Sequence, residues 1–159
     1  MLDKIELYKK SRLTLEFVHL FEYIKSVSKI IGEKKAWEIM KKNITKRRSR
    51  WLKENIEKIS PEYSELETAR QVLILKLGVD PKELNVIERK SDKIVIKSDN
   101  FCPILTACEI LGWSPKKICK LVCEGAAREF MSEVNPKLAF KFTKTRPVSR
   151  YCEEVISLK

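Results

Sequence analysis

Glycine and histidine are scarce in this chain of 159 residues, which contains 4 Gly, 6 Pro and 1 His. So little glycine, with no fixed sequence period, excludes a collagen-like chain and a low-complexity chain. The sequence also has no phosphate-binding glycine loop, no dinucleotide fingerprint and no nucleophile elbow. Neither NAD nor a bound nucleotide is therefore predicted.

Long apolar segments are lacking as well. The stretch from Leu13 to Ile31 is interrupted by ionisable residues, namely Glu16, His19, Glu22, Lys25 and Lys29. A membrane helix needs roughly 18 apolar residues, so no membrane span is predicted. The N-terminal sequence MLDKIELYKK lacks the apolar core of a secretory signal. We therefore expect a cytoplasmic protein, in which the five cysteines are mostly reduced.

Acidic residues are outnumbered, because 33 Lys and Arg face 22 Asp and Glu in a chain with a formal net charge of +11. Residues 1–60 hold 16 basic and 8 acidic residues, so the excess lies in the first part of the chain. The abundance of Lys, Glu and Ile also suggests a thermophilic host, in which charged surfaces support ion-pair networks.

The basic residues are densest over residues 41–53, which include seven basic residues and no acidic one. A basic run beside an aromatic residue is typical of surfaces that contact phosphates. The candidate nucleic-acid contacts are Lys46, Arg47, Arg48 and Arg50. A solvated helix face is the favoured interpretation, because charge runs are common on amphipathic helices.

Apolar residues recur at helical spacing through the first half of the chain. Leu13–Ile31 is predicted to be one amphipathic helix, and a second is predicted from Glu33 to Ile59 with a break near Asn43. Ser60 precedes Pro61 and has the character of an N-cap. It is predicted to open a third helix that ends at Gly78.

After Asp80-Pro81 the sequence changes to short runs that are rich in β-branched residues. The predicted elements are strands over Leu84–Arg89 and Lys93–Lys97, helices over Pro103–Leu111 and from Pro115 to about Glu133, and strands over Lys137–Thr143 and Tyr151–Leu158. Two hairpins around a helical pair most simply form a four-stranded antiparallel sheet with helices on one face. The predicted fold is therefore α+β, with N-terminal helices followed by ββ-αα-ββ.

This pattern predicts a helical region over residues 1–80 and an α+β domain over residues 81–159. The amphipathic helices of the first region are expected to cover the sheet or to form a separate layer. They would pack onto the second half, or onto its copy in a homodimer.

All five cysteines fall in the second half, at positions 102, 108, 119, 123 and 152. No CxxC pair or Cys/His finger spacing occurs, so a conventional structural zinc module is not predicted. Cys102 precedes a predicted helix N-terminus, which favours the thiolate. Cys119 and Cys123 are four residues apart and share one helix face. Burial in the core is the alternative for each cysteine, and the favoured one for Cys108 and Cys119.

The second half contains four short motifs, at residues 100–103, 121–125, 135–138 and 149–156. The order of these motifs resembles that of the 4-vinyl reductase-like domain family and its relatives, the L-2-amino-thiazoline-4-carboxylic acid hydrolase-like proteins, over about half of the chain. The resemblance implies an α+β fold shared with haem-based nitric-oxide sensors and vesicle-tethering subunits, used to hold a small molecule or a metal. It also implies that Cys102, Cys123 and Cys152 lie together.

The sequence therefore predicts a protein that binds a small molecule or a metal, with zinc or iron held by Cys102, Cys123 and Cys152 beside a hydrophobic pocket. The candidates for a fourth ligand are Cys119, Glu124 and His19. His19 is interpreted alternatively as a solvated side chain.

Two other functions are left open. The first alternative is a metal-assisted hydrolase of a small heterocyclic or amide substrate, because a thiolate-bound metal activates water. The second is a basic module that binds nucleic acid. The residues do not decide whether the protein is an enzyme.

Overall fold

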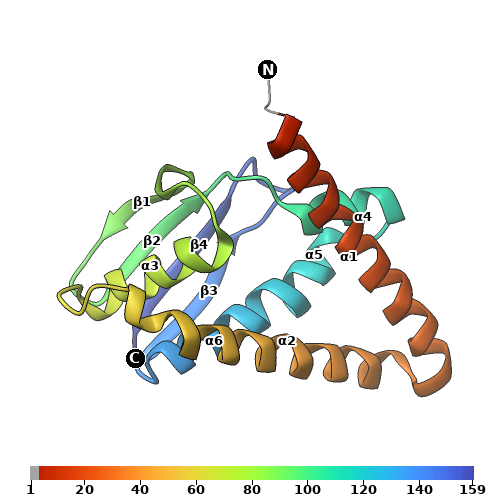
Figure 1. Ribbon diagram of the computed structural model, residues 1–159, viewed down its shortest axis with the longest axis horizontal. Coiled ribbons are helices and arrows are strands. Elements are labelled where there is room, and N and C mark those ends of the chain that lie inside the picture. The colour runs from red at the N-terminus through yellow and green to blue at the C-terminus, as the bar shows by residue number, and fades with distance from the viewer. Residues whose placement is uncertain (1–3) are drawn as a thin grey trace.

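The computed structural model of the chain describes residues 4–159, apart from the side chain of Glu6 (Figure 1). The helices and strands, in chain order, are α1 (Lys4–Ile31), α2 (Glu33–Asn55), α3 (Glu65–Leu77), β1 (Leu84–Arg89), β2 (Lys93–Ser98), α4 (Pro103–Leu111), α5 (Pro115–Ile118), α6 (Gly125–Val134), β3 (Leu138–Lys144) and β4 (Cys152–Leu158). Short 3-10 turns cover Ile56–Lys58 and Pro81–Glu83, and a π-helical segment, Cys119–Glu124, connects α5 to α6. Among the described residues, no helix combines the length and apolar character that crossing a bilayer requires.

The four strands form one antiparallel sheet in the order β1-β2-β4-β3. Ile156 of β4 lies opposite Ile94 of β2 on one side and opposite Phe140 of β3 on the other. Because residues that pair directly share a face of the sheet, these side chains form one apolar face. The helices α3 and α6 pack on this face, for example through Val72 and Met131. The prediction of an α+β fold with a four-stranded antiparallel sheet is confirmed.

A second apolar core lies where α1 and α2 meet α4 and α5, to one side of the sheet (Figure 1). Its centre is Phe21 of α1, whose side chain is 0% exposed. The Phe21 ring stacks on Trp113 at 5.5 Å between ring centroids and lies 6.4 Å from the ring of Trp37. Trp37 belongs to α2 and Trp113 to the connection between α4 and α5. Phe21 therefore holds three separate segments together.

Both cores combine residues from the two sides of Asp80-Pro81. The first core contains Val72 of α3 and Ile96 of β2, and the second contains Phe21 of α1 and Cys108 of α4. The first half therefore packs onto the second: α3 covers the sheet, while α1 and α2 form a further layer against the later helices. The two parts share both cores, so they pack as one body. The domain boundary at residue 80 stays a prediction.

The helices differ from the predictions in several details: α2 ends at Asn55 and not at Ile59, and a π segment interrupts the helix predicted from Pro115 to about Glu133. The helix α1 begins before the predicted Leu13, and α2 continues through Asn43 without a break. The predicted N-cap at Ser60 is wrong, because Ser64 caps α3 instead. Its hydroxyl accepts a hydrogen bond from the backbone amide of Glu67 at 3.3 Å.

Replacing Phe21 tests the second core. Phe21→Ala removes a fully buried ring and leaves a cavity between two indoles, so we expect it to lower the free energy of unfolding by about 3–5 kcal/mol. Guanidinium unfolding followed by circular dichroism measures this loss. In the control variant Tyr23→Ala, a side chain that is 68% exposed is removed from the same helix. Its effect should stay within about 0.5 kcal/mol. Equal effects of the two substitutions would contradict the central role of Phe21.

Candidate functional site

Four of the five cysteines lie outside both apolar cores, whereas Cys108 is fully buried in the second core, as predicted. We call these four, Cys102, Cys119, Cys123 and Cys152, the thiol layer. Cys102 immediately precedes α4, Cys119 and Cys123 belong to the π segment, and Cys152 begins β4. Cys119 is buried, as expected, and the other three are partly exposed.

Cys119 and Cys123 form a hydrogen-bonded pair of thiols. The hydrogen bond from Cys123 and the positive charge of Arg146 lower the pKa of the Cys119 thiol to about 7. The same hydrogen bond and burial both stabilise the protonated form of Cys123, so they raise the pKa of Cys123 well above the ordinary 9.0. The pair therefore loses its first proton near neutral pH. Both residues lie on the π segment, and π-helical turns within helices are frequent at functional sites.

Cys102 acts as the N-cap of α4, because its Sγ accepts a hydrogen bond from the backbone amide of Leu105 at 3.4 Å. Burial nevertheless raises the pKa of the Cys102 thiol, and it outweighs the opposing effects of the Leu105 amide and Arg146. The helix N-terminus therefore favours the thiolate, as predicted, but its effect is smaller than that of burial. Electrostatic interactions connect Cys102 to Cys119, Cys123 and Cys152, so the thiol layer is one region.

The predicted metal ligands can now be compared with the structure. Within residues 4–159, no group of three or more His, Cys, Asp or Glu is placed to hold a metal ion. His19 lies on the exposed side of α1. Glu124 forms an ion pair with Arg128 at 2.7 Å. The zinc or iron site at Cys102, Cys123 and Cys152 therefore stays a prediction.

Arg146 is the cation of the thiol layer. Its Nη1 donates a hydrogen bond to the backbone oxygen of Asn100 at 2.7 Å. Its Nε is buried and has no hydrogen-bond partner. In the described part of the chain, it is the one buried side-chain nitrogen or oxygen in this situation. Nearby Glu154 accepts a hydrogen bond from the Ser98 hydroxyl at 2.7 Å, and burial raises the pKa of this carboxyl group. Burial thus disfavours the ionised form of Glu154, which interacts electrostatically with Arg146, so the Cys119 thiolate can serve as a counter-charge of Arg146.

The residues of the basic run on α2 differ in exposure. Lys46, Arg47 and Arg50 are exposed, and Arg48 is partly exposed. Burial lowers the pKa of the Arg48 guanidinium, which interacts electrostatically with Cys123 and Glu129. The four predicted nucleic-acid contacts are therefore not equally accessible. Nucleic-acid binding stays a prediction.

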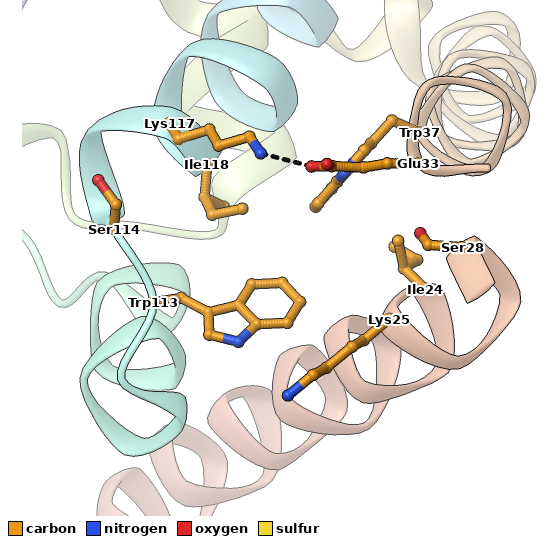
Figure 2. Close-up of a pocket in the computed structure, with 9 residues that line it drawn as sticks. All are labelled: Ile24, Lys25, Ser28, Glu33, Trp37, Trp113, Ser114, Lys117 and Ile118. Carbon is orange, nitrogen blue, oxygen red and sulfur yellow. Dashed lines mark hydrogen bonds and ion pairs between the residues drawn. The ribbon is translucent and has the colours of Figure 1, made fainter.

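A separate pocket of about 390 Å³ lies between α1, α2 and the connection from α4 to α5 (Figure 2). Its aromatic walls are Trp37 and Trp113, whose ring centroids are 6.5 Å apart at an interplanar angle of 66°. Ile24 and Ile118 add apolar surface. The polar residues that line it are Lys25, Ser28, Glu33, Ser114 and Lys117.

An ion pair crosses one side of this pocket, between Glu33 in the first turn of α2 and Lys117 of α5 (Figure 2). Glu33 also accepts a hydrogen bond from the side chain of Trp37. The pKa of Glu33 is lowered mainly by the hydrogen bond from Lys117 and by the positive charge of Lys117. The ion pair therefore connects two helices at the pocket and orients one of its indoles.

No cysteine lines this pocket. Ile118 does, and Cys119 follows it directly, so the pocket and the thiol layer are neighbours along the chain. Trp113 was not among the site residues predicted from the sequence. The available signal was an aromatic residue directly after Gly112, the residue that ends α4 with a φ of 64°. A bulky side chain at position 113 lies close to α5, the next helix.

No protein-family model and no curated protein matches the chain. The similarity to the 4-vinyl reductase-like family therefore remains an expectation from short segments of the sequence.

The effect of Arg146 on the thiol pair can be measured. Arg146→Gln removes a positive charge beside Cys119, so we expect the pKa of Cys119 to rise from about 7 toward the ordinary 9.0. Thiolate absorbance in the far ultraviolet, recorded from about pH 5 to pH 10, follows this titration. The step near neutral pH should be absent from Cys119→Ser, which assigns it to this residue.

The control is Arg150→Gln, which removes an exposed arginine a few residues further on. The near-neutral step should stay in place in this variant. If Arg146→Gln and Arg150→Gln gave the same titration, Arg146 would not be the charge that sets the pKa of Cys119.

Proposed function

We propose that the protein binds a small, mainly apolar molecule in the pocket lined by Trp37 and Trp113. The observation that carries this proposal is a concave site of about 390 Å³ with aromatic and aliphatic walls and a few polar groups. Ligand sites typically have volumes of about 300–1,000 Å³ and this kind of lining. The two indoles pack edge to face against each other and so form one aromatic wall, against which a flat ligand can lie.

The pocket also suits binding because its walls come from segments that are far apart in the sequence. Ile24 lies on α1, Trp37 on α2 and Trp113 after α4. A ligand that contacts all three would stabilise their arrangement, since a molecule that binds only the folded state raises its stability. Binding is therefore expected to raise the melting temperature as well as to change the indole fluorescence.

A separate observation supports a second binding function. The thiol layer draws sulfur ligands from three segments into one region, and thiolates prefer zinc, copper and iron over hard cations. We propose that zinc or iron binds there through Cys102, Cys123 and Cys152. The thiols as placed do not form a group of metal-ligand geometry, so binding would have to bring them closer together. The hydrolase alternative depends on this metal.

A fluorescent probe tests the pocket. N-Phenyl-1-naphthylamine is neutral, flat and apolar, and we expect it to bind with a Kd on the order of 0.2 mM, from ~0.3 kcal/mol per non-hydrogen atom. Ser28→Trp fills the pocket with an indole and should weaken binding by more than about tenfold. Fluorescence titration measures both values.

The matched control is Ser26→Trp, which adds the same side chain at an exposed position of α1 outside the pocket lining. This variant should bind the probe like the unmodified protein. Equal affinities for the Ser28 and Ser26 variants would show that the probe does not enter this pocket.

Metal analysis tests the thiol layer. Protein purified without added metal or an affinity tag should carry about one equivalent of zinc or iron, because three thiolates and one further ligand complete a tetrahedral site. The triple variant Cys102→Ser, Cys123→Ser, Cys152→Ser should lose it. Cys108→Ser is the control, since this cysteine is buried in the second core. Full retention of metal by the triple variant would remove this assignment.

A further inference from the structure

We infer that the ligand of the pocket is an organic anion, with an apolar body against the wall formed by Trp37 and Trp113 and an acidic group held by Lys25 and by the indole N–H of Trp113. A carboxylate or a sulfonate on a flat ring system has this chemistry. The inference rests on the proposed function, because it assumes that the pocket binds a small molecule.

The charges that line the pocket leave one cation without a counter-ion. Lys117 is paired with Glu33, and Glu33 in addition accepts a hydrogen bond from Trp37. Lys25 also lines the pocket, and it forms no ion pair or hydrogen bond with any of residues 4–159. The lining therefore has a net positive charge that a bound anion would neutralise.

Trp113 supplies a second donor. Its ring is fixed by stacking on the buried Phe21 at 5.5 Å. Figure 2 shows the indole nitrogen of Trp113 and the ammonium group of Lys25 at the same edge of the pocket. The N–H of Trp113 has no acceptor among the side chains and backbone that the structure describes, whereas the N–H of Trp37 donates to Glu33. One carboxylate or sulfonate can accept from both an indole N–H and an ammonium.

The same groups disfavour the other ligand charges. A cation would gain from the faces of the two indoles, but Lys25 and the net charge of +11 oppose its approach. A neutral apolar molecule would bury the Trp113 N–H without an acceptor, which costs free energy. An organic anion gains from the apolar walls and satisfies both donors.

Two probes with the same ring system test the inference. 1-Anilinonaphthalene-8-sulfonate differs from N-phenyl-1-naphthylamine by a sulfonate, so the ratio of their Kd values isolates the anionic group. We expect the sulfonate probe to bind about three to ten times more tightly, as for a hydrogen-bonded charge at the edge of an apolar site. This preference should shrink when salt is raised to about 0.5 M, because ions screen exposed charges.

Lys25→Gln should remove most of the preference, by weakening the sulfonate probe and leaving the neutral probe unchanged. The control is Lys29→Gln, which removes an exposed lysine one turn further along α1 that does not line the pocket. It should keep the preference. Equal losses in the two lysine variants would show that only the overall charge of the protein matters, and would overturn the inference.

The remaining outcomes separate this inference from the proposed function. If neither probe binds the unmodified protein, the proposed function fails and the inference with it. If the neutral probe binds, Ser28→Trp abolishes its binding and the two probes have equal affinities, the pocket is a ligand site but the inference is wrong. If the sulfonate probe binds the Ser28→Trp variant unchanged, the anion is held elsewhere, for example in the groove of about 340 Å³ on the other flank of α1 and α2, and the inference is again wrong.

Discussion

The burial of Phe21 is the contact on which the arrangement of the helices depends. Its ring meets Trp113 on one side and Trp37 on another, so a single side chain of α1 fixes α2 and the connection between α4 and α5. The two indoles that pack against Phe21 also form the walls of the pocket. The pocket is therefore a consequence of core packing, and its shape depends on the same contacts as the stability of the second core.

The thiol layer follows a different rule, because it gathers ionisable groups outside the two apolar cores. Burial disfavours charge, and it raises the pKa values of Cys102 and Glu154. Cys119 is the exception, since the hydrogen bond from Cys123 and the charge of Arg146 stabilise its thiolate. Cys119 directly follows Ile118 of the pocket, so a ligand that shifts Ile118 would also change the surroundings of this thiolate.

Local signals predicted the elements well where they agreed with one another. The helix Pro103–Leu111 was predicted because a proline opens it and Gly112 ends it, and it is confirmed. The strand Leu84–Arg89, which was predicted from its β-branched residues, is likewise confirmed. The start of α3 was misplaced because two serines compete for the N-cap. Ser64 is followed three residues later by Glu67, the spacing of a capping box, whereas Ser60 is not followed by such a residue.

The sequence by itself determined which segments are helical and which are extended, and the placement of Cys119 and Cys123 on one side of a helical segment, because these properties depend on near neighbours in the chain. Only the tertiary structure decided which distant side chains meet. Trp37 meets Trp113, Arg146 lies beside Cys119, and Arg48 is only partly exposed although its neighbour Arg47 is exposed. Such contacts are set by how whole elements pack against one another. The hydrophobic periodicity of one element does not indicate which residues of another element it will contact.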